Sequence, residues 1–281
     1  MKESELKKNN IQLLEKLSLA YRLLNSCEFC EHRCRVNRLQ GEMGFCGATD
    51  QTYIYSEFIH YGIEMDLIPA YALFFSGCNM RCIYCSGQEG LSPIYGVPLE
   101  PKIVVNRIND AVNEGTKTVL LVGGEPALYP HTILELAMYE TSELPFILDT
   151  NLYMTESLFA IFDSVIDIYL ADFKFGNNHC AEHIAGVPRY YETITRNLLL
   201  ANAHALVYIR HLLLPGHFDC CFRPIVDWIC KNLPEAKVHI MGSYEPAYLR
   251  EKKSELNRKI TTREIANAFD YAKNLNIHVV D

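Results

Sequence analysis

Short apolar, β-rich segments alternate with helical patterns from residue 71 onward, and this alternation restricts the possible folds more than any other feature. The expected strands cover residues 71–76, 118–122, 145–148, 166–171, 206–213 and 238–241, with a last apolar run at 277–280. The expected helices cover residues 101–114, 131–140, 155–163, 188–202, 219–232 and 262–274. Such alternation predicts a parallel sheet covered by helices. Six units are too few for a closed eight-fold barrel, so we predict an α/β fold, a partial (βα)6 TIM-like barrel.

The first 60 residues do not follow this alternation. Residues 4–25 carry apolar side chains at helical spacing, which predicts an amphipathic helix with Ile11, Leu14, Leu17, Ala20, Tyr21 and Leu24 on one face. Residues 27–47 are rich in cysteine, charge and glycine, and residues 52–60 are typical of a strand. We therefore predict two domains: a helix with a cysteine-rich metal-binding module at 1–60, and the barrel at 61–281.

Composition and charge exclude several classes of function. The formal charge of −8 over 281 residues argues against nucleic acid as the main partner. No apolar run approaches the roughly 20 residues that cross a bilayer, and no signal peptide follows the polar start, so a cytoplasmic protein is expected. In that reducing compartment the 11 cysteines are not expected to form disulfides, and their clustering indicates metal sites.

Three cysteines follow the first expected barrel strand at the spacing C-x3-C-x2-C: Cys78, Cys82 and Cys85. Three thiolates on one loop can bind three irons of a cubane and leave the fourth iron open, whereas most electron-transfer clusters have four cysteine ligands. A zinc site and a chance spacing are the alternatives.

This loop, with Tyr84 before its last cysteine, resembles the signature of the radical S-adenosylmethionine (SAM) superfamily. The resemblance implies a 4Fe–4S cluster whose open iron binds SAM. It also implies cleavage of SAM by one electron into methionine and a 5′-deoxyadenosyl radical, which abstracts hydrogen from a substrate under anaerobic conditions. A flavodoxin- or ferredoxin-type donor would supply the electron. The protein's task is then positioning and exclusion of water.

Further motifs stand at the ends of later strands, where such folds gather their active sites. After the second strand comes Gly123-Gly124-Glu125-Pro126, whose glycines permit close approach of a ligand. In the radical SAM superfamily this motif contacts the amino group of SAM. The resemblance therefore implies that these four residues bind the cofactor.

The next three strand ends resemble the consecutive motifs of pyruvate formate-lyase activating enzymes: Asp149-Thr150-Asn151, Asp172-Phe173-Lys174 and Ile209-Arg210-His211. The resemblance implies a monovalent cation, Na+ or K+, held against the SAM carboxylate by Asp149, Thr150, Asp172 and the Leu170 carbonyl. Hard oxygen ligands suit such an ion. It implies further SAM contacts from Asp149, Asn151, Asp172 and Arg210. Strand-end caps and salt bridges are the alternative.

Three residues are the catalytic candidates. Lys174 and Arg210 are expected to face SAM or substrate, and Tyr244, after the sixth strand, to lie over the adenosine or substrate. The resemblance also has one departure, because the family has glycine after the Asp-Thr-Asn motif and this chain has Leu152. Leucine there predicts a turn that avoids positive φ.

Four more cysteines precede the barrel at the spacing C-x2-C-x3-C-x11-C: Cys27, Cys30, Cys34 and Cys46. Four thiols can complete a tetrahedral zinc site or ligate a full cubane. The arrangement resembles an N-terminal extension of some activating-enzyme-like radical SAM proteins. We favour an auxiliary 4Fe–4S cluster over structural zinc and over free thiols. The scattered Cys180, Cys220, Cys221 and Cys230 are expected to be buried, inert thiols.

These observations leave three hypotheses about function. The first is a radical SAM enzyme that abstracts hydrogen from a peptide or protein, in the manner of an activating enzyme. The second keeps this chemistry but acts on a small-molecule metabolite. The third is a non-catalytic iron–sulfur or zinc protein that senses redox state or scaffolds a complex. The motifs that match SAM contacts argue against the third, because a sensor does not need them.

Overall fold

The computed structural model describes residues 3–62, 64–140, 142–250 and 255–280, with side chains from residue 11 onward. By its internal contacts the chain divides into two compact units. The first unit comprises Met1–Asn79, Glu89–Asp149 and Met154–Asp167, and the second comprises Met80–Gln88, Thr150–Tyr153 and Ile168–Asp281. The separation of residues 1–60 as a domain of their own stays a prediction.

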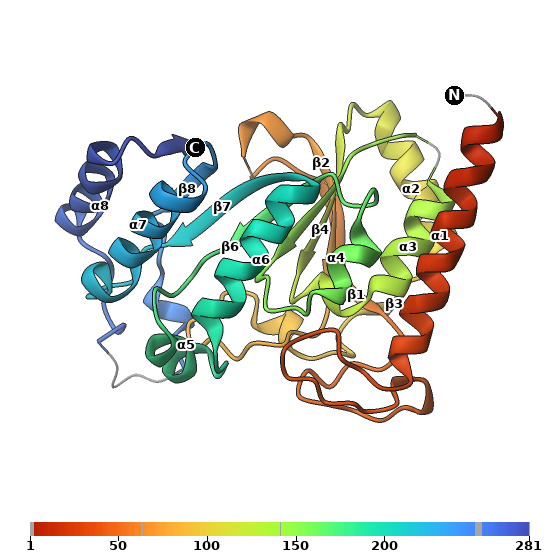
Figure 1. Cartoon of the computed structure of the whole chain (residues 1–281), viewed down its shortest axis with the longest axis horizontal. Helices are drawn as coiled ribbons and strands as arrows, with labels where there is room; N and C mark the ends of the chain where they lie inside the picture. The colour runs from red at the N-terminus through yellow and green to blue at the C-terminus, as the bar shows by residue number, and fades with distance from the viewer. Residues whose placement is uncertain (1–2, 63, 141, 251–254, 281) are drawn as a thin grey trace. The chain divides into compact units, whose positions relative to one another are not determined.

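The first unit contains one sheet with helices packed on it (Figure 1). Its strands are hydrogen-bonded in the order β3-β1-β2-β4-β5. β1 pairs antiparallel with β2 and β3, whereas β2, β4 and β5 run parallel. The elements are α1 (Glu3–Leu24), β1 (Tyr53–His60), β2 (Ala70–Phe75), β3 (Val97–Pro98), α2 (Pro101–Asn113), β4 (Thr118–Gly123), α3 (Pro130–Tyr139), β5 (Phe146–Thr150) and α4 (Ser157–Phe162).

The second unit continues the alternation with parallel strands in the order β6-β7-β8-β9. Its elements are β6 (Ile168–Asp172), α5 (Asn178–Ala185), α6 (Tyr190–His204), β7 (Leu206–Leu212), a π-helical turn (Phe218–Phe222), α7 (Arg223–Asn232), β8 (Lys237–Met241), α8 (Thr262–Asn274) and β9 (His278–Val280). The sequence predicted all of these except α5 and the π-helical turn. The eight residues of α5 are too few to show a helical period.

Six strands, β2, β4, β5, β6, β7 and β8, are each followed by a helix. The prediction of an α/β fold with a partial (βα)6 barrel is therefore confirmed. The strands read as continuous apolar runs because both faces are covered, and β2 and β4 are almost wholly buried. Local signals set helix starts: Pro101 opens α2, and Thr261 with Glu264 forms a capping box on α8.

Helix α1 forms as predicted, but its buried face differs from the prediction. Ala20 and Leu24 are buried, whereas Ile11 and Leu14 are more than half exposed. The packed stripe includes Leu13, Leu17, Ala20 and Leu24. At about 100° per residue, Ile11 lies roughly 150° and Leu14 roughly 90° around the helix from the centre of this stripe. Among the described residues no helix is long and apolar enough to span a membrane.

The turn after β5 contradicts the expectation that leucine keeps it out of positive φ. Leu152 has φ of 54° although its side chain is fully buried. Such a conformation costs about 1–2 kcal/mol for a non-glycine residue. Side-chain hydrogen bonds offset this cost: the Leu152 N–H donates to Thr150 Oγ1 (3.1 Å) and the Tyr153 N–H to Asn151 Oδ1 (2.9 Å). The Leu152 carbonyl accepts from Asn197 Nδ2 at 2.7 Å.

We expect Asn197→Ala to destabilise this turn. Asn197 is fully buried on α6, so its loss removes a hydrogen bond from a buried carbonyl. The free energy of unfolding should fall by about 2 kcal/mol, and the melting temperature by roughly 5 °C. Asn202→Ala, at an exposed position of the same helix, is the matched control and should change the melting temperature little. Equal melting temperatures for the two variants would show that the turn does not depend on Asn197.

Candidate functional site

The carboxyl ends of β2 and β4 bring two of the predicted motifs together in the first unit. The strands pair in register from Ala70 opposite Thr118 to Phe75 opposite Gly123. The Gly124 N–H donates to the Phe75 carbonyl and the Glu125 N–H to the Gly77 carbonyl, each at 2.8 Å. A Cβ on Gly124 would lie 2.1 Å from the Gly77 oxygen, so only glycine fits. The glycine-glycine-glutamate motif therefore lies directly against the residue before Cys78.

The side chain of Glu125 is almost completely buried at this strand end. Its Oε1 accepts from the Ala127 N–H at 3.1 Å, which fixes the carboxylate at the start of the short turn Pro126–Leu128. A buried carboxylate is stable as an anion only beside donors or a cation. Its chemistry suits the ammonium group that the sequence analysis assigned to it.

The second unit contains the remaining two cysteines of the loop. Its backbone is held by the end of α5, because the N–H groups of Arg81 and Ile83 donate to the carbonyls of Ala185 (2.8 Å) and Ile184 (2.9 Å). Burial raises the pKa of the Cys82 thiol to about 12, and the nearby Lys174 ammonium opposes this rise. A metal that binds here must therefore displace a firmly held proton.

Three predicted site residues of the second unit meet at the ends of β6 and β7. Asp172 stands opposite Arg210 in the strand register, and the Asp172 carboxylate pairs with the Lys174 ammonium. The Lys174 N–H donates to the Tyr190 hydroxyl at 2.8 Å. His211 Nδ1 bonds the Phe173 carbonyl at 2.7 Å, and burial lowers the pKa of this imidazole to about 4. A neutral histidine thus fixes the loop that carries Lys174.

Tyr84 and Tyr244 also meet, as edge-to-face rings with centroids 6.0 Å apart. The Tyr244 hydroxyl donates to the Leu256 carbonyl at 2.8 Å. The Tyr84 hydroxyl is buried and has no hydrogen-bond partner among the described residues. A buried hydroxyl without a partner costs free energy unless a ligand supplies one. The position beside the last loop cysteine fits a cofactor contact.

The predicted cation ligands are divided between the two units. Asp149 begins its motif and is half-buried in the first unit. In the second unit Thr150 Oγ1 and Asn151 Oδ1 accept backbone N–H groups of the Leu152 turn. Each oxygen retains a further lone pair for a ligand. The cation site stays a prediction.

The four N-terminal cysteines gather in the first unit, and each sulfur faces a donor. Cys27 faces Arg38 Nη1 at 4.0 Å, and Cys34 accepts the Phe45 N–H at 3.3 Å. Backbone N–H groups of His32 and Ala48 bond the sulfurs of Cys30 and Cys46 and lower their pKa values. Burial nonetheless raises the pKa of Cys30 to about 12, and the three other sulfurs add to that rise. The four sulfurs are therefore close enough to affect one another electrostatically, and a metal site among them stays a prediction.

The buried side chain of Arg38 lies beside these cysteines. Arg38 is fully buried and donates to the carbonyls of Thr49 (3.0 Å) and Leu128 (2.7 Å). Its guanidinium lies 5.5 Å from the ring centroid of Phe29 and 5.3 Å from that of Tyr129. In the described part of the chain no carboxylate pairs with it. A buried cation needs an anion nearby, and the thiolates of the predicted metal site would supply that charge.

Sequence reasoning missed one further group, Cys180, His217 and Cys220, in the second unit. Cys180 and Cys221 are buried as expected, but Cys220 is exposed and Cys230 is only partly buried, so the expectation of a buried thiol is wrong for these two. The π-helical turn places Cys220 at the surface. The short spacing between His217 and the Cys220-Cys221 pair is a weak signal, and Cys180 lies too far along the chain to be linked to it.

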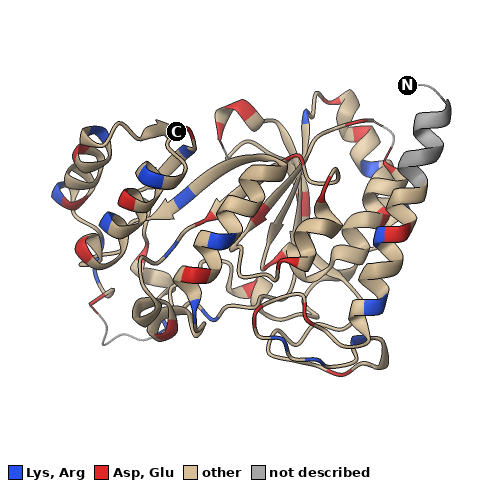
Figure 2. Ribbon diagram, viewed as in Figure 1, with Lys and Arg blue, Asp and Glu red and all other residues tan. Residues whose placement is uncertain are grey.

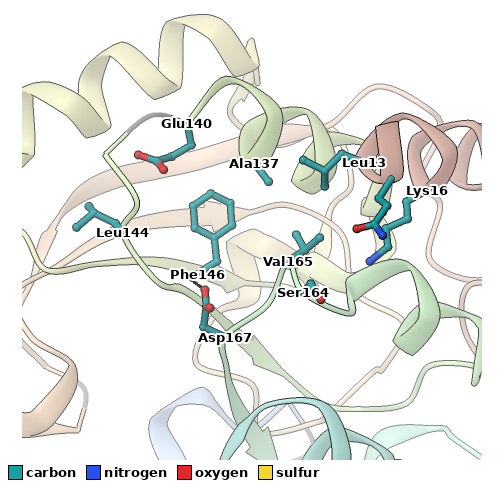
Figure 3. A pocket seen from close by; sticks show the side chains of 10 residues that line it. Leu13, Lys16, Ala137, Glu140, Leu144, Phe146, Ser164, Val165 and Asp167 are labelled. Atoms are coloured by element: carbon teal, nitrogen blue, oxygen red, sulfur yellow. Dashed lines mark hydrogen bonds between the residues drawn. The ribbon is translucent and has the colours of Figure 1, made fainter. Parts of the chain in front are cut away.

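A surface pocket of about 250 Å³ in the first unit lies away from these motifs (Figure 3). It is lined by residues of α1, α3 and the start of β5. Lys16 donates to the Asp163 carbonyl, and the Phe146 N–H donates to the Asp167 carboxylate at 2.8 Å. Lys16 thus ties α1 to the end of α4, and Asp167 binds the amino end of β5. In barrel folds that end contributes to stability, and catalysis occurs at the other end.

Comparison with known proteins agrees with this geometry. A family model for the Radical SAM superfamily matches residues 73–229. An uncharacterised protein of Methanocaldococcus jannaschii is 36% identical over 273 residues, which are 94% of this chain and 79% of that protein. The pyruvate formate-lyase 1-activating enzyme of Escherichia coli is 26% identical over 159 residues, 52% of this chain and 61% of the enzyme.

Two further similarities differ in kind. The 7-carboxy-7-deazaguanine synthase of Methanothermobacter thermautotrophicus is 32% identical over 108 residues, 37% of this chain and 42% of the enzyme. The crystal structure of Streptococcus suis SuiB bound to precursor peptide SuiA superposes with a TM-score of 0.54 at 14% identity, over 72% of this chain and 46% of that one. That structural likeness shows the fold alone. The matches span less than two thirds of the activating enzyme, the synthase and SuiB.

The chain belongs to the radical SAM superfamily. It is an enzyme of that superfamily with homology to pyruvate formate-lyase activating enzymes, as the motifs predicted. Membership implies a 4Fe–4S cluster and SAM as cofactors.

We expect Arg38→Met to weaken metal binding by the N-terminal cysteines. The substitution removes the buried cation that faces Cys27 and Cys46, so the affinity for metal should fall about tenfold or more. The measurement is metal retained per chain during competition with a chelator. Arg35→Met, in the same loop but largely exposed, is the matched control and should retain metal like the unmodified protein. Equal retention by both variants would contradict a metal centre beside Arg38.

Proposed function

We propose that Cys78, Cys82 and Cys85 ligate the 4Fe–4S cluster of this enzyme and leave one iron open for SAM. The observation that carries the proposal is the hydrogen bond from the Glu125 backbone to Gly77, which holds an amine-binding motif against the residue before the first cysteine. When bound, the cluster supplies the electron that breaks the C5′–S bond of SAM, giving methionine and the 5′-deoxyadenosyl radical.

The chain's own residues then have separate tasks. The Glu125 carboxylate binds the amino group of SAM. The Tyr84 hydroxyl, which has no hydrogen-bond partner among the described residues, forms a hydrogen bond with the cofactor. Asp172 and Arg210, paired in register, carry opposite charges, and Lys174 is bonded to Asp172. These three bind the SAM carboxylate, its monovalent cation or the substrate. Tyr244 covers the same region through its contact with Tyr84.

For the N-terminal cysteines we propose an auxiliary 4Fe–4S cluster. Four ligands at about 2.3 Å from a zinc ion would place their sulfurs about 3.8 Å apart. Among the described residues, no three of these cysteines have all their sulfurs within 4.8 Å of one another. The wider spacing suits a cubane. Buried Arg38 also argues against neutral free thiols, because its charge would then lack an anion.

We propose a peptide or protein as the substrate. The relative that supports this is an activating enzyme, named for its action on pyruvate formate-lyase, and SuiB shares the fold and is described with a precursor peptide. The second candidate is a small molecule, favoured by the similarity to 7-carboxy-7-deazaguanine synthase. Nucleic acid is not favoured, because Lys and Arg are interspersed with Asp and Glu in both units (Figure 2). The electron donor would be of the flavodoxin or ferredoxin type.

Anaerobic reconstitution with iron, sulfide, dithionite and SAM tests the catalytic proposal. We expect the protein to form 5′-deoxyadenosine, measured by mass spectrometry, and Cys82→Ala to lower it to the level without enzyme, because the cluster loses one of three ligands. Cys230→Ala is the matched control, because Cys230 lies on α7 and its thiol faces the carbonyl of Leu275, which follows α8. Equal product from Cys82→Ala and Cys230→Ala would contradict the assigned ligands.

The substrate class can be tested with material from cells grown in deuterated medium. Transfer of deuterium into 5′-deoxyadenosine from the macromolecular fraction, but not from the low-molecular-weight filtrate, is expected for a peptide or protein substrate. The opposite result would favour the small-molecule alternative.

A further inference from the structure

A second group of metal-ligating side chains lies in the second unit, apart from the radical SAM motifs. The group consists of Cys180, His217 and Cys220, whose ligand atoms all lie within 4.8 Å of one another. Among the described residues, no other group of three or more histidine, cysteine or acidic side chains meets this distance. Cys180 is in α5, and the other two stand before and within the π-helical turn. We propose that these three residues bind a zinc ion.

The distance between the two sulfurs fits a tetrahedral ion. Cys180 Sγ and Cys220 Sγ are 3.9 Å apart. Two thiolates on one zinc ion, each at about 2.3 Å, lie about 3.8 Å apart. A disulfide would require a separation of about 2.05 Å. The separation is therefore one that two ligands of a single zinc ion can have.

The tautomer of His217 is fixed by its surroundings. Its Nδ1 lies 2.9 Å from the Pro215 carbonyl. A carbonyl can only accept, so Nδ1 carries the hydrogen and the neutral ring has its lone pair on Nε2. Protein zinc sites use this arrangement, in which a backbone carbonyl orients the imidazole from behind. The ring is almost completely buried, so the orientation is held.

Asn177 supports the thiol side of the site. Its Nδ2 donates to Cys180 Sγ at 3.3 Å and to the Cys220 carbonyl at 2.7 Å. Its Oδ1 accepts the Cys180 N–H at 2.8 Å and so caps α5. One side chain thus links both cysteine segments and offers an N–H to a sulfur. Outer hydrogen bonds of this kind orient and tune metal ligands.

The charges of this donor set match a divalent ion. Two thiolates and a neutral imidazole neutralise Zn²⁺, and the thiol protons pass to solvent on binding. The softness of the donors selects zinc over magnesium or calcium. Cys220 is exposed, so an ion can enter from solvent. For the fourth position the candidates are the Glu255 carboxylate, whose Oε1 lies 3.5 Å from His217 Nε2, the Cys221 thiol, whose sulfur lies 3.9 Å from that of Cys220, and water.

The ion would cross-link the segments that follow β6 and β7. These already touch closely, because a Cβ on Gly176 would lie 2.5 Å from the Cys221 carbonyl oxygen. The first segment carries Lys174, whose ammonium is bonded to Asp172. The ligands are thus positioning residues, which hold a loop of the proposed SAM site and do not touch the reacting atoms.

Metal analysis of anaerobically purified protein tests the site separately from catalysis. We expect Cys220→Ala to contain about one zinc per chain less than Cys230→Ala, with equal iron in both. Cys220 is exposed and Cys230 is half-exposed on the neighbouring helix, so both variants should fold, which their melting curves would show. Equal zinc in the two variants would overturn the proposal, whether or not 5′-deoxyadenosine is formed.

Anomalous diffraction at the zinc edge from crystals of the unmodified protein decides the matter without any variant. A peak bonded to Cys180, His217 and Cys220 is expected. No peak there, or a Cys180–Cys220 disulfide in anaerobic crystals or in peptide maps, would overturn the proposal.

Discussion

The close contact between Gly77 and the Gly124-Glu125 backbone is the constraint on which the proposed SAM site depends. Parallel pairing of β2 and β4 brings their carboxyl ends level, and two backbone hydrogen bonds hold the turns together. No Cβ fits between them. The first loop cysteine and the buried glutamate therefore arise from one piece of backbone geometry, fixed by ladder hydrogen bonds that do not depend on any ligand. The proposed binding of SAM requires little reorganisation of this part of the chain.

Much of this could be predicted from sequence, because the signals were local. Apolar runs gave the strands, and the cysteine spacing gave the loop. The left-handed Leu152 was not predicted, since part of its support comes from Asn197, 45 residues further along the chain. The environment of Cys220 could not be predicted either. Cys180 and His217 come from two different segments, which meet only after β6 and β7 pair. Spacing rules detect ligands on one loop; they do not detect ligands that tertiary structure assembles.

Arg38 connects the N-terminal cysteine loop, the proposed site of the auxiliary cluster, to the sheet of the first unit. Its guanidinium bonds the Leu128 carbonyl, just beyond β4, and lies near Tyr129, whose hydroxyl donates to the Ser76 carbonyl at the start of the cysteine loop. The N-terminal cysteines are thus tied to the same strand ends as the radical SAM motifs. A buried charge is expensive to desolvate, so this tie is strongest when the sulfurs are anionic.

Helix α5 links the two sites of the second unit. At its first turn lies Cys180, a proposed zinc ligand, and at its last turn lie the carbonyls that hold Arg81 and Ile83 of the proposed iron-binding loop. The helix has eight residues, so it spans only about 12 Å. Removal of the proposed zinc ion would make the first turn of α5 more mobile. Because the helix is short, its last turn would become more mobile as well. A chelator that removes zinc and leaves iron in place would then make the proposed catalytic cluster more prone to damage by oxygen.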